Sequence, residues 1–445
     1  MNYLIYGLGR SGVAVANFLV KNEENVYVYD DDKKLAKELL ESAILDKNCS
    51  TMQKLCAKTL CIVHCIVLSP GVKIDKKLQK LIKEFKIEVI GELAFASKFC
   101  TAPIYAITGT NGKTSTVNCL TQIFKSAGFK THAVGNVGNA FSGVVDKIAP
   151  SDKIVCEVSS FQLEHSQDFK VKAVAFLNIA PDHLDRYRDF DEYFNAKKII
   201  LDRVENGGEI FLNYDDEKVR ALGQKYHNVE YFSLQPLPNG YNGLFIEDKK
   251  IYKKTATEVH FVANLDKFKL IGNHNLSNLL CAISFALYDG VLPQIIQKVI
   301  NSIKPIPHRI EKIGTVNGVT YYNDSKATNT NSTMVAVNCF DKNIWLLLGG
   351  SDKGESFKVF LQNLPSTVQH IVAFGETGRK IAKLARKLKT FEVFLCKNLI
   401  SAFDCAKSYA KNGEIVLLSP ACASFDEFHN FKERGEFFKN LVLEK

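Results

Sequence analysis

The stretch "YAITGTNGKTSTVN" (105–118) has the residue types of a phosphate-binding loop: a short apolar strand, a glycine-rich turn, then Lys113, Thr114 and a helical pattern. Glycines let backbone N–H groups face a phosphate at a helix N-terminus, a lysine supplies positive charge, and a threonine hydroxyl can ligate Mg²⁺. The spacing G-x-x-x-x-G-K-[ST] requires a glycine at the position of Ile107. The compact form G-T-N-G-K-T after a strand nevertheless favours a nucleotide loop over an accidental strand–turn–helix junction.

Acidic residues and a histidine follow two further predicted strands. "CEVSSFQLE" ends a strand at Glu157, where a carboxylate could be a second magnesium ligand, and "APDHLDRY" gathers Asp182, His183, Asp185 and Arg186 in one loop. Acids at strand ends are common, and a lone histidine is more often structural than a ligand. Because α/β proteins bind ligands at the carboxyl ends of their strands, the second cluster favours a functional role.

Two helical stretches carry polar pairs whose roles the sequence leaves open. "GNHNLSNLLCA" places Asn275 and Asn278 three residues apart on one helical face, which suits recognition of a base or ribose and equally suits helix capping. "YFNAKKII" contains Lys197 and Lys198. A pair of lysines on a helix is normally a solvated face, and nothing in the pattern singles out either one.

Polar residues or glycines follow three strands near the C-terminus, in "YYNDSKATN", "LLLGGSDKGESF" and "LLSPACASFDEF". Strand ends of this kind define one rim of a sheet and predict a ligand crevice. The residues of this rim are Asp324, Ser325, Lys326, Thr328, Lys353, Ser419, Ser424 and Phe425.

The N-terminal stretch "YGLGRSG" matches G-x-G-x-x-G through Gly7, Gly9 and Gly12, and Asp30 closes the next strand. This spacing is typical of a dinucleotide fold, so an NAD-dependent oxidoreductase is one hypothesis. The same geometry holds any nucleotide that bears a diphosphate. The oxidoreductase hypothesis also leaves the loop around Lys113 and the C-terminal third of the chain unexplained.

Strands and helices alternate along the chain, which predicts an α/β fold of three domains. We expect an N-terminal Rossmann-like nucleotide-binding domain over 1–96, a central P-loop ATPase domain over 97–304, and a C-terminal Rossmann-like domain over 305–445. An alternating β pattern from about 220 to 265 predicts a β-rich edge on the central domain. The proline-containing stretch 304–309 reads as a linker and a hinge between open and closed forms.

Composition bounds the class of protein. The 445 residues are 46% apolar and 24% charged, as in soluble globular proteins. No apolar run reaches the roughly 18 residues of a membrane span, and the first residues enter a strand pattern without the features of a signal peptide, so we expect a cytoplasmic protein.

The formal charge of +9 comes mostly from lysines on helical patterns. It favours solvated faces and an anionic substrate over a nucleic-acid groove. The twelve cysteines include no C-x-x-C pair, which argues against zinc.

Taken together, the motifs resemble those of the Mur ligase family. "ITGTNGKT", "EVSSFQLE", "DHLDRY", "NDSKATN", "LLLGG" and "LLSPACASFDEF" occur in the family's order, nearly end to end. By itself, "GTNGKT" is also found in folylpolyglutamate synthases and in the other Mur ligases, whereas "GLGRSG", "SPG" (69–71) and "SPACASFDEF" point to the D-glutamate-adding member. The resemblance also implies that the short loop with Ile107 is the family's own form.

The resemblance implies an ATP-dependent ligase that adds D-glutamate to UDP-N-acetylmuramoyl-L-alanine in cytoplasmic peptidoglycan precursor synthesis, and so serves cell wall formation, cell shape and division. The acceptor carboxylate would take the γ-phosphate of ATP, and the D-glutamate amine would displace phosphate from the acyl phosphate. The alternatives are another Mur ligase, a folylpolyglutamate synthase-like ligase, or the oxidoreductase. We expect a monomer that binds neither nucleic acid nor membrane.

The resemblance also implies roles for individual residues. Lys113, Glu157, His183 and Lys197 would be catalytic, with Thr114, Glu157, His183 and a carbamylated Lys197 holding two Mg²⁺ ions. The ATP-binding residues would be Gly109, Thr110, Asn111, Gly112, Lys113, Thr114, Ser115, Asn275, Asn278, Arg309 and Asp324. The substrate-binding residues would be Gly9, Arg10, Ser11, Asp30, Ser69, Asn136, Ser159, Gln162, Lys326, Thr328, Lys353, Ser424, Phe425 and Phe431. Asp31 and Asp32 depart from the hydroxyl or basic residue expected beside the nucleotide.

Overall fold

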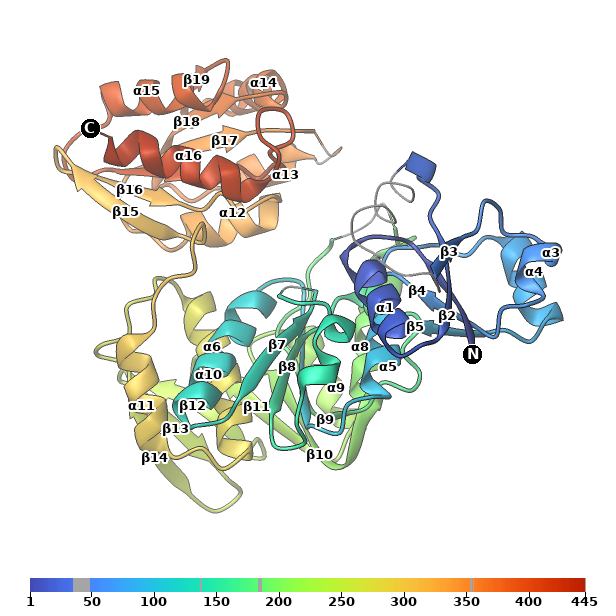
Figure 1. The fold of residues 1–445 in the computed structure, drawn as a ribbon. Coiled ribbons are helices and arrows are strands. Elements are labelled where there is room, and N and C mark those ends of the chain that lie inside the picture. Colours follow the sequence, from blue (N-terminus) through green and yellow to red (C-terminus); the bar gives the residue numbers. More distant parts are fainter. Residues whose placement is uncertain (35–48, 137, 183–185, 353, 355, 445) are drawn as a thin grey trace. The chain divides into compact units, whose positions relative to one another are not determined.

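The computed structural model describes residues 1–34, 49–136, 138–182, 186–352, 354 and 356–444. Contacts divide the chain into two compact units, Met1–Lys267 with Ser277–Asn301 and Phe268–Leu276 with Ser302–Lys445. Three sheets and their flanking helices make up the described residues (Figure 1), so the predicted α/β class is confirmed. The boundaries predicted for the three domains stay a prediction.

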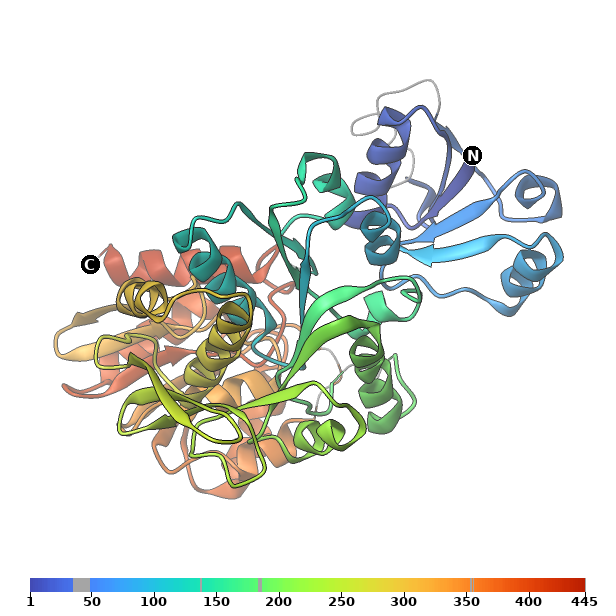
Figure 2. The same ribbon diagram turned by 90° about the horizontal axis from the view of Figure 1, so that it is seen from below.

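The first sheet has the strand order β3-β2-β1-β4-β5, and all its neighbouring strands are parallel. Its inner strands are apolar on both sides, as β4 "CIVL" shows, because helices cover both faces. Helices α1 and α5 pack on one face and α3 and α4 on the other (Figure 2). The elements are β1 (Asn2–Tyr6), α1 (Arg10–Lys21), β2 (Asn25–Tyr29), β3 (Cys49–Thr51), α3 (Ala57–Leu60), β4 (Cys65–Leu68), α4 (Lys76–Glu84), β5 (Glu88–Gly91) and α5 (Glu92–Ser97).

The second sheet has the order β14-β13-β12-β11-β10-β9-β6-β8-β7. It is parallel from β7 to β12, and β13 and β14 add an antiparallel edge, which confirms the predicted β-rich edge. Its strands are β6 (Ile104–Thr108), β7 (Thr131–Gly135), β8 (Lys153–Glu157), β9 (Val171–Phe176), β10 (Val204–Asn213), β11 (Val229–Ser233), β12 (Gly243–Glu247), β13 (Lys250–Lys254) and β14 (Val259–Asn264). Its helices are α6 (Lys113–Ser126), η1 (Phe141–Gly143), η2 (Val145–Lys147), α7 (Ser160–Leu163), α8 (Phe190–Lys198), η3 (Ile199–Arg203), α9 (Glu217–Leu222), η4 (Gly223–Lys225), α10 (Asn273–Tyr288) and α11 (Pro293–Ser302).

The third sheet belongs to the second unit and has the order β15-β16-β20-β17-β18-β19, parallel except for β15 with β16. Its centre, β17 "IWLLLG" and β20 "IVLL", is fully buried between helices. The elements are β15 (Glu311–Val316), β16 (Val319–Asn323), α12 (Thr330–Val337), β17 (Ile344–Gly349), α13 (Phe357–Gln362), β18 (Val368–Phe374), α14 (Gly378–Leu388), β19 (Glu392–Leu395), α15 (Leu399–Tyr409), β20 (Ile415–Leu418) and α16 (Phe431–Leu443).

The strand pairing of the second sheet positions the predicted phosphate loop. Strand β6 lies between β8 and β9, and Ile107 pairs with Glu157 in β8. The loop that leaves β6 therefore starts beside the carboxyl ends of both neighbours. Within the described part of the chain, no helix is long and apolar enough to cross a membrane.

Candidate active site

The glycine loop between β6 and α6 is held in shape by its backbone and by the end of β9. Gly112 has φ +87°, and a Cβ there would lie 2.2 Å from Asn278 Oδ1, so this position requires glycine. Asn178 O accepts from Thr110 N at 3.0 Å, and Asn178 Oδ1 accepts from Asn111 N at 2.8 Å. Asn178 therefore holds the loop through two backbone amides, and the loop leads directly into the N-terminus of α6.

Lys113 begins α6 and brings positive charge to this loop. Its Nζ donates to Gly109 O at 2.7 Å and to Thr110 O at 2.8 Å. An ammonium group beside glycine-loop amides at a helix N-terminus is an arrangement that attracts polyphosphate. Thr114 is buried in the next position of the helix, and Ser115 is half-buried.

Glu157 ends β8 with a buried carboxylate, 1% exposed. Oε1 accepts from Asn136 Nδ2 at 3.0 Å, and Oε2 has no hydrogen-bond partner among the described residues. A buried carboxylate oxygen without a partner costs free energy unless a cation or donor meets it. Its position next to the phosphate loop fits a hard divalent cation such as Mg²⁺.

Lys197 lies near the end of α8 and is 2% exposed, so the solvated-face reading is wrong for this lysine. Burial, and then the charge of Lys113, holds its pKa well below the usual value, against the opposing charges of Asp182 and Glu157. Its Nζ lies 4.9 Å from the ring centroid of Tyr193. The side chain is thus a buried amine whose neutral form is favoured more than that of an exposed lysine. Lys198 is a different case, because its Nζ donates to Asn195 at 2.9 Å in an exposed contact.

Asn275 and Asn278 both lie in α10, but they do different things. Asn278 faces Gly112, and its Oδ1 accepts from Thr116 Oγ1 at 3.3 Å. Asn275 lies near the start of the helix, and its Nδ2 donates to Ile271 O at 2.7 Å. The contact of Asn275 is a donor bond to a carbonyl and not the capping bond of a side-chain oxygen, whereas Asn278 packs against the phosphate loop.

The N-terminal glycine loop also has a defined geometry. Gly12, in α1, would place a Cβ 1.9 Å from Gly7 O and 2.8 Å from Ser69 Oγ, so helix and loop approach too closely for a side chain. Ser69 Oγ donates to Gly7 O at 2.6 Å, and Asp30 Oδ2 accepts from Leu8 N at 2.6 Å. Ser69 and Asp30 thus shape the loop.

Arg10 connects this loop to the second sheet. Its Nη2 donates to Asn136 O at 3.0 Å, and the side chain of Asn136 contacts Glu157. Gly9 and Arg10 are exposed and Ser11 is half-buried, which leaves this rim accessible to a ligand. Arg10, Asn136 and Glu157 form a chain of contacts from the first sheet to the phosphate loop.

The departure at Asp31 has a local explanation. Its Oδ2 accepts from Tyr6 OH at 3.0 Å and its Oδ1 accepts from Tyr29 OH at 3.2 Å. The carboxylate is therefore engaged by two tyrosines of the first sheet.

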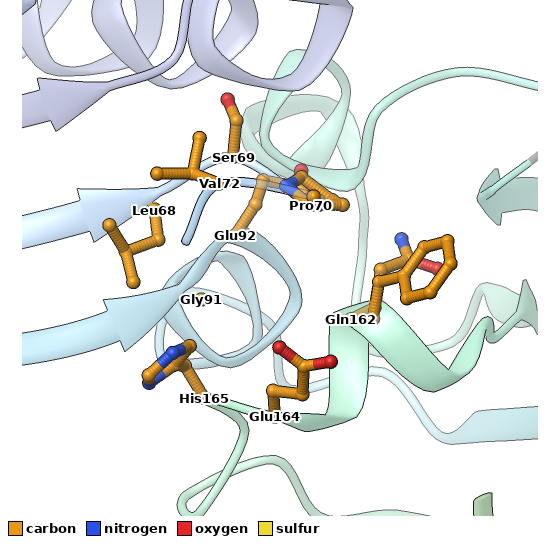
Figure 3. A pocket seen from close by; sticks show the side chains of 11 residues that line it. Leu68, Ser69, Pro70, Val72, Gly91, Glu92, Gln162, Glu164 and His165 are labelled. Atoms are coloured by element: carbon orange, nitrogen blue, oxygen red, sulfur yellow. The ribbon is translucent and has the colours of Figure 1, made fainter. Parts of the chain in front are cut away.

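A small pocket lies between the first sheet and the segment around α7 (Figure 3). Predicted substrate residues Ser69 and Gln162 line it from the two sides. Gln162 Oε1 also accepts from Ser159 N at 3.0 Å and from Ser159 Oγ at 2.9 Å, which begins α7 with a capping box. The lining residues are Leu68, Ser69, Pro70, Gly71, Val72, Gly91, Glu92, Phe161, Gln162, Glu164 and His165.

In the second unit, Asp324 follows β16 and is buried. Its Oδ2 accepts from Ser419 Oγ at 2.7 Å and its Oδ1 from Ile310 N at 3.2 Å. Burial raises the pKa of Asp324 to about 7, and these two hydrogen bonds and the charge of Arg309 oppose the rise. Asp324 and Arg309 are thus close enough to interact, as their shared predicted role requires.

Arg434 of α16 is buried and contacts two loops that carry predicted amino-acid-binding residues. Its Nε donates to Ser325 Oγ at 2.9 Å and its Nη2 to Ser325 O at 2.8 Å. Its Nη1 donates to Ala423 O and its Nη2 to Cys422 O, each at 3.0 Å. Arg434 therefore joins the loop after β16 to the loop after β20, which carry Lys326, Thr328, Ser424 and Phe425.

These four residues differ in exposure. Ser424 is buried, Thr328 is half-buried, and Phe425 is 71% exposed. Lys326 Nζ lies 5.0 Å from the ring centroid of Phe431, whose carbonyl accepts from Ser325 Oγ at 2.9 Å. The structure thus gathers Lys326 and Phe431.

Two predicted site residues, His183 and Lys353, lie outside the described residues, as does Asp185. Asn178 and Arg434 were missed. Asn178 follows a strand, so the strand-end rule that singled out Glu157 could have found it. Arg434 sits within a helix with charged neighbours, and its sequence carries no signal of its buried role.

Comparisons with known proteins cover the whole chain. The family model "Mur ligase MurD-like, N-terminal domain" matches residues 1–91, "Mur ligase middle domain" matches 107–286, and "Mur ligase, glutamate ligase domain" matches 308–422. The UDP-N-acetylmuramoylalanine–D-glutamate ligase of Thermoanaerobacter sp. (strain X514) is 39% identical over 99% of this chain and 98% of its own. The protein of the same name from Alkaliphilus oremlandii (strain OhILAs) is 36% identical over 99% and 98%.

Solved structures share the fold at lower identity. A pseudomurein peptide ligase type C from Methanothermus fervidus aligns with a TM-score of 0.63 at 20% identity, over 99% of both chains. The UDP-N-acetylmuramate–alanine ligase of Thermotoga maritima aligns with a TM-score of 0.58 at 16% identity, over 100% of this chain and 99% of that one. On the strength of its full-length relatives, this chain belongs to the Mur ligase family.

Proposed function

We propose that this protein is an ATP-dependent ligase that joins D-glutamate to UDP-N-acetylmuramoyl-L-alanine, with ADP and phosphate as products, in peptidoglycan precursor synthesis. The observation that carries the proposal is the 39% identity to a ligase of that name over 99% of the chain. The phosphate loop, with Lys113 inside it and Glu157 beside it, supports ATP as the energy source.

A carboxylate repels a nucleophile and offers no leaving group, so the reaction must first activate it. In the proposed mechanism the acceptor carboxylate takes the γ-phosphoryl group, the D-glutamate amine attacks the acyl carbon, and phosphate leaves. The loop Gly109–Gly112 orients the phosphates through its amides, and Lys113 offsets their charge. Asn278 holds the loop in shape from α10, and Asn275, Arg309 and Asp324 are proposed to bind the rest of ATP.

Mg²⁺ is the implied metal, and the unpartnered Oε2 of Glu157 is the observation that fits it. Thr114, Glu157, His183 and a carbamylated Lys197 would hold two such ions. When bound, the ion offsets phosphate charge and polarises the transferred group. Asn136 orients the other oxygen of Glu157, which leaves Oε2 in a fixed position.

The substrate residues divide between the two units. Gly9, Arg10, Ser11, Asp30, Ser69, Asn136, Ser159 and Gln162 are proposed to bind the UDP-linked acceptor. Lys326, Thr328, Lys353, Ser424, Phe425 and Phe431 are proposed to bind D-glutamate, whose two carboxylates suit lysine and hydroxyl donors. We place the enzyme in the cytoplasm as a monomer.

Lys197 is proposed to carry a carbamate. The neutral amine that its lowered pKa favours would attack CO₂ through the nitrogen lone pair and lose one proton to solvent. An ammonium group at Lys197 would be repelled by Lys113, whereas a carbamate is an anion and would be attracted. Mass spectrometry under native conditions with CO₂ should find one CO₂ adduct that Lys197→Arg abolishes and Lys198→Arg keeps. An unmodified wild-type Lys197 would contradict this assignment.

The function is tested with purified protein, by phosphate release in the presence of ATP and Mg²⁺. Release should require both UDP-N-acetylmuramoyl-L-alanine and D-glutamate, and L-glutamate or other amino acids should not replace D-glutamate. Release with a different amino acid would assign the chain to another Mur-type ligase. Release without the UDP-linked acceptor would contradict the proposal.

A further inference from the structure

Arg186 is an arginine of the first unit to which no role has been given so far, although its motif pointed to function. Its side chain is 11% exposed and contacts the turn after β4 and the residue that follows α7. Nη1 donates to Gly71 O at 2.9 Å, in the turn after β4. Nε donates to Glu164 Oε1 at 3.2 Å and Nη2 to Glu164 Oε2 at 2.6 Å. Glu164 follows α7, so one guanidinium group joins the turn of the first sheet to an element of the second.

The pair of Arg186 and Glu164 is fixed from other sides as well. The guanidinium carbon lies 4.5 Å from the ring centroid of Phe161. Tyr187 OH donates to Glu164 Oε1 at 3.1 Å, and the rings of Tyr187 and Phe161 stack with centroids 6.0 Å apart. A bidentate ion pair with a ring against the guanidinium plane holds the arginine in one orientation. The side chain is thus a rigid support for Gly71.

The turn that Arg186 holds belongs to the proposed acceptor site. Ser69 and Gly71 line the pocket of Figure 3, together with Gln162 and Glu164. At its other end, the turn is tied to the N-terminal glycine loop, because Ser69 Oγ donates to Gly7 O. Gly71 itself has φ +98°, and no atom lies within 4 Å of where a Cβ would be, so no side chain packs against that position. A backbone hydrogen bond from Val72 N to Ser69 O closes the turn at 3.2 Å, and the hydrogen bond from Arg186 ties the carbonyl of Gly71 to the segment after α7.

We propose that Arg186, with Glu164 as its partner, is a positioning residue that holds the turn 69–72 in place for the UDP-linked acceptor. The inference rests on the proposed function and deepens it. The phosphate loop is anchored separately, by Asn178. Loss of Arg186 should therefore weaken acceptor binding and leave ATP binding nearly unchanged.

The test compares Arg186→Lys with Arg188→Lys in the full chain. Lysine keeps the charge but cannot form the bidentate pair and reach Gly71 O together. Arg188 is the matched control, because it is an arginine in the same segment whose exposed side chain pairs with Glu192. For Arg186→Lys we expect KM for the acceptor to rise about tenfold or more, because a charge-assisted hydrogen bond is lost. KM for ATP should change less than about twofold. Arg188→Lys should change neither.

Glu164→Gln is the milder second variant, because the amide oxygen can still accept from Arg186. It should raise the acceptor KM by about threefold. Calorimetry without ATP should show a larger loss of acceptor affinity for Arg186→Lys than for Glu164→Gln. An equal rise of KM for ATP and acceptor, or a lowered Tm with unchanged acceptor affinity, would show a merely structural role and overturn the proposal. A wild-type protein without acceptor-dependent phosphate release would overturn the proposed function instead.

Discussion

Two glycine loops of the described residues have the same plan, each between a parallel strand and a helix, but groups of opposite charge hydrogen-bond to their backbones. At the N-terminal loop, the amide of Leu8 already donates to the carboxylate of Asp30. At the central loop, the ammonium group of Lys113 donates to the carbonyls of Gly109 and Thr110. Glycine spacing sets the shape of such a loop, and the side chains around it decide the ligand.

The difference has a consequence for each substrate. The carboxylate of Asp30 occupies the amide of Leu8, so this amide is not available to a phosphate and instead fixes the shape of the N-terminal loop. The central loop combines amides, a helix N-terminus and a cation, which all attract one. The G-x-G-x-x-G fingerprint by itself is therefore weak evidence for NAD, and the central loop is the better candidate for ATP.

The largest expected effect comes from removing the cation of the central loop. Lys113→Ala should lower ATP-dependent phosphate release by about a thousandfold, because a preorganised charge on the transferred phosphoryl group is lost. Calorimetry without ATP should find acceptor affinity unchanged. Lys125→Ala, at the exposed end of the same helix, is the control and should behave as the wild type. A variant at Lys113 that keeps a tenth of the activity would contradict the comparison.

The next effect tests the shape of the N-terminal loop. Gly12→Ala should lower the free energy of unfolding by about 2 kcal/mol, because a methyl group would meet the backbone oxygen of Gly7 and force helix and loop apart. Denaturant unfolding measures the change. Gly9→Ala is the comparison for stability, since no atom lies within 4 Å of its Cβ position. Equal destabilisation at both sites would show that the close approach is not what requires glycine.

A smaller effect is expected from the acid of the N-terminal loop. Asp30→Asn keeps an oxygen for Leu8 N but removes the charge, which weakens the hydrogen bond by about 1 kcal/mol. We expect KM for the UDP-linked acceptor to rise about fivefold and KM for ATP to stay constant, as measured by phosphate release. A change confined to the ATP constant would mean that the two loops do not serve separate substrates.

The smallest effect concerns pH. Glu92 lies at the start of α5 and is buried. Its Oε1 accepts from Ser142 N at 2.8 Å and from Ser142 Oγ at 2.7 Å. Burial raises the pKa of Glu92, and these hydrogen bonds and the charge of Arg10 oppose the rise. The folded state keeps this proton to higher pH than the unfolded state, so the carboxylate costs stability once the pH exceeds its ordinary pKa. Glu92→Gln should raise Tm by a few degrees at about pH 8 and not at about pH 4.

Thermal unfolding across this pH range measures that gain, with Glu84→Gln, exposed on α4, as the control. A gain of the same size at both ends of the range would rule out titration of Glu92 as its source.

Much of the fold followed from local patterns, and much of the site did not. Both glycine loops lie between the predicted strand and helix, and Glu157 lies beside the loop because parallel strands end at one edge. The burial of Lys197 could not be predicted from the pattern, because the neighbouring residue Lys198 is also a lysine and lies in the same helix. The roles of Asn178 and Arg434 depend on contacts between residues far apart in sequence, which no periodicity reports.

The sequence by itself determined the alternation of strands and helices, the glycine positions and the family, because backbone freedom and apolar periodicity act over a few residues. Only the tertiary structure decided which of two adjacent lysines is buried, which oxygen of Glu157 lacks a partner among the described residues, and which arginine holds the turn at Gly71. Those properties depend on desolvation and on distances between segments that meet only when the sheets pack.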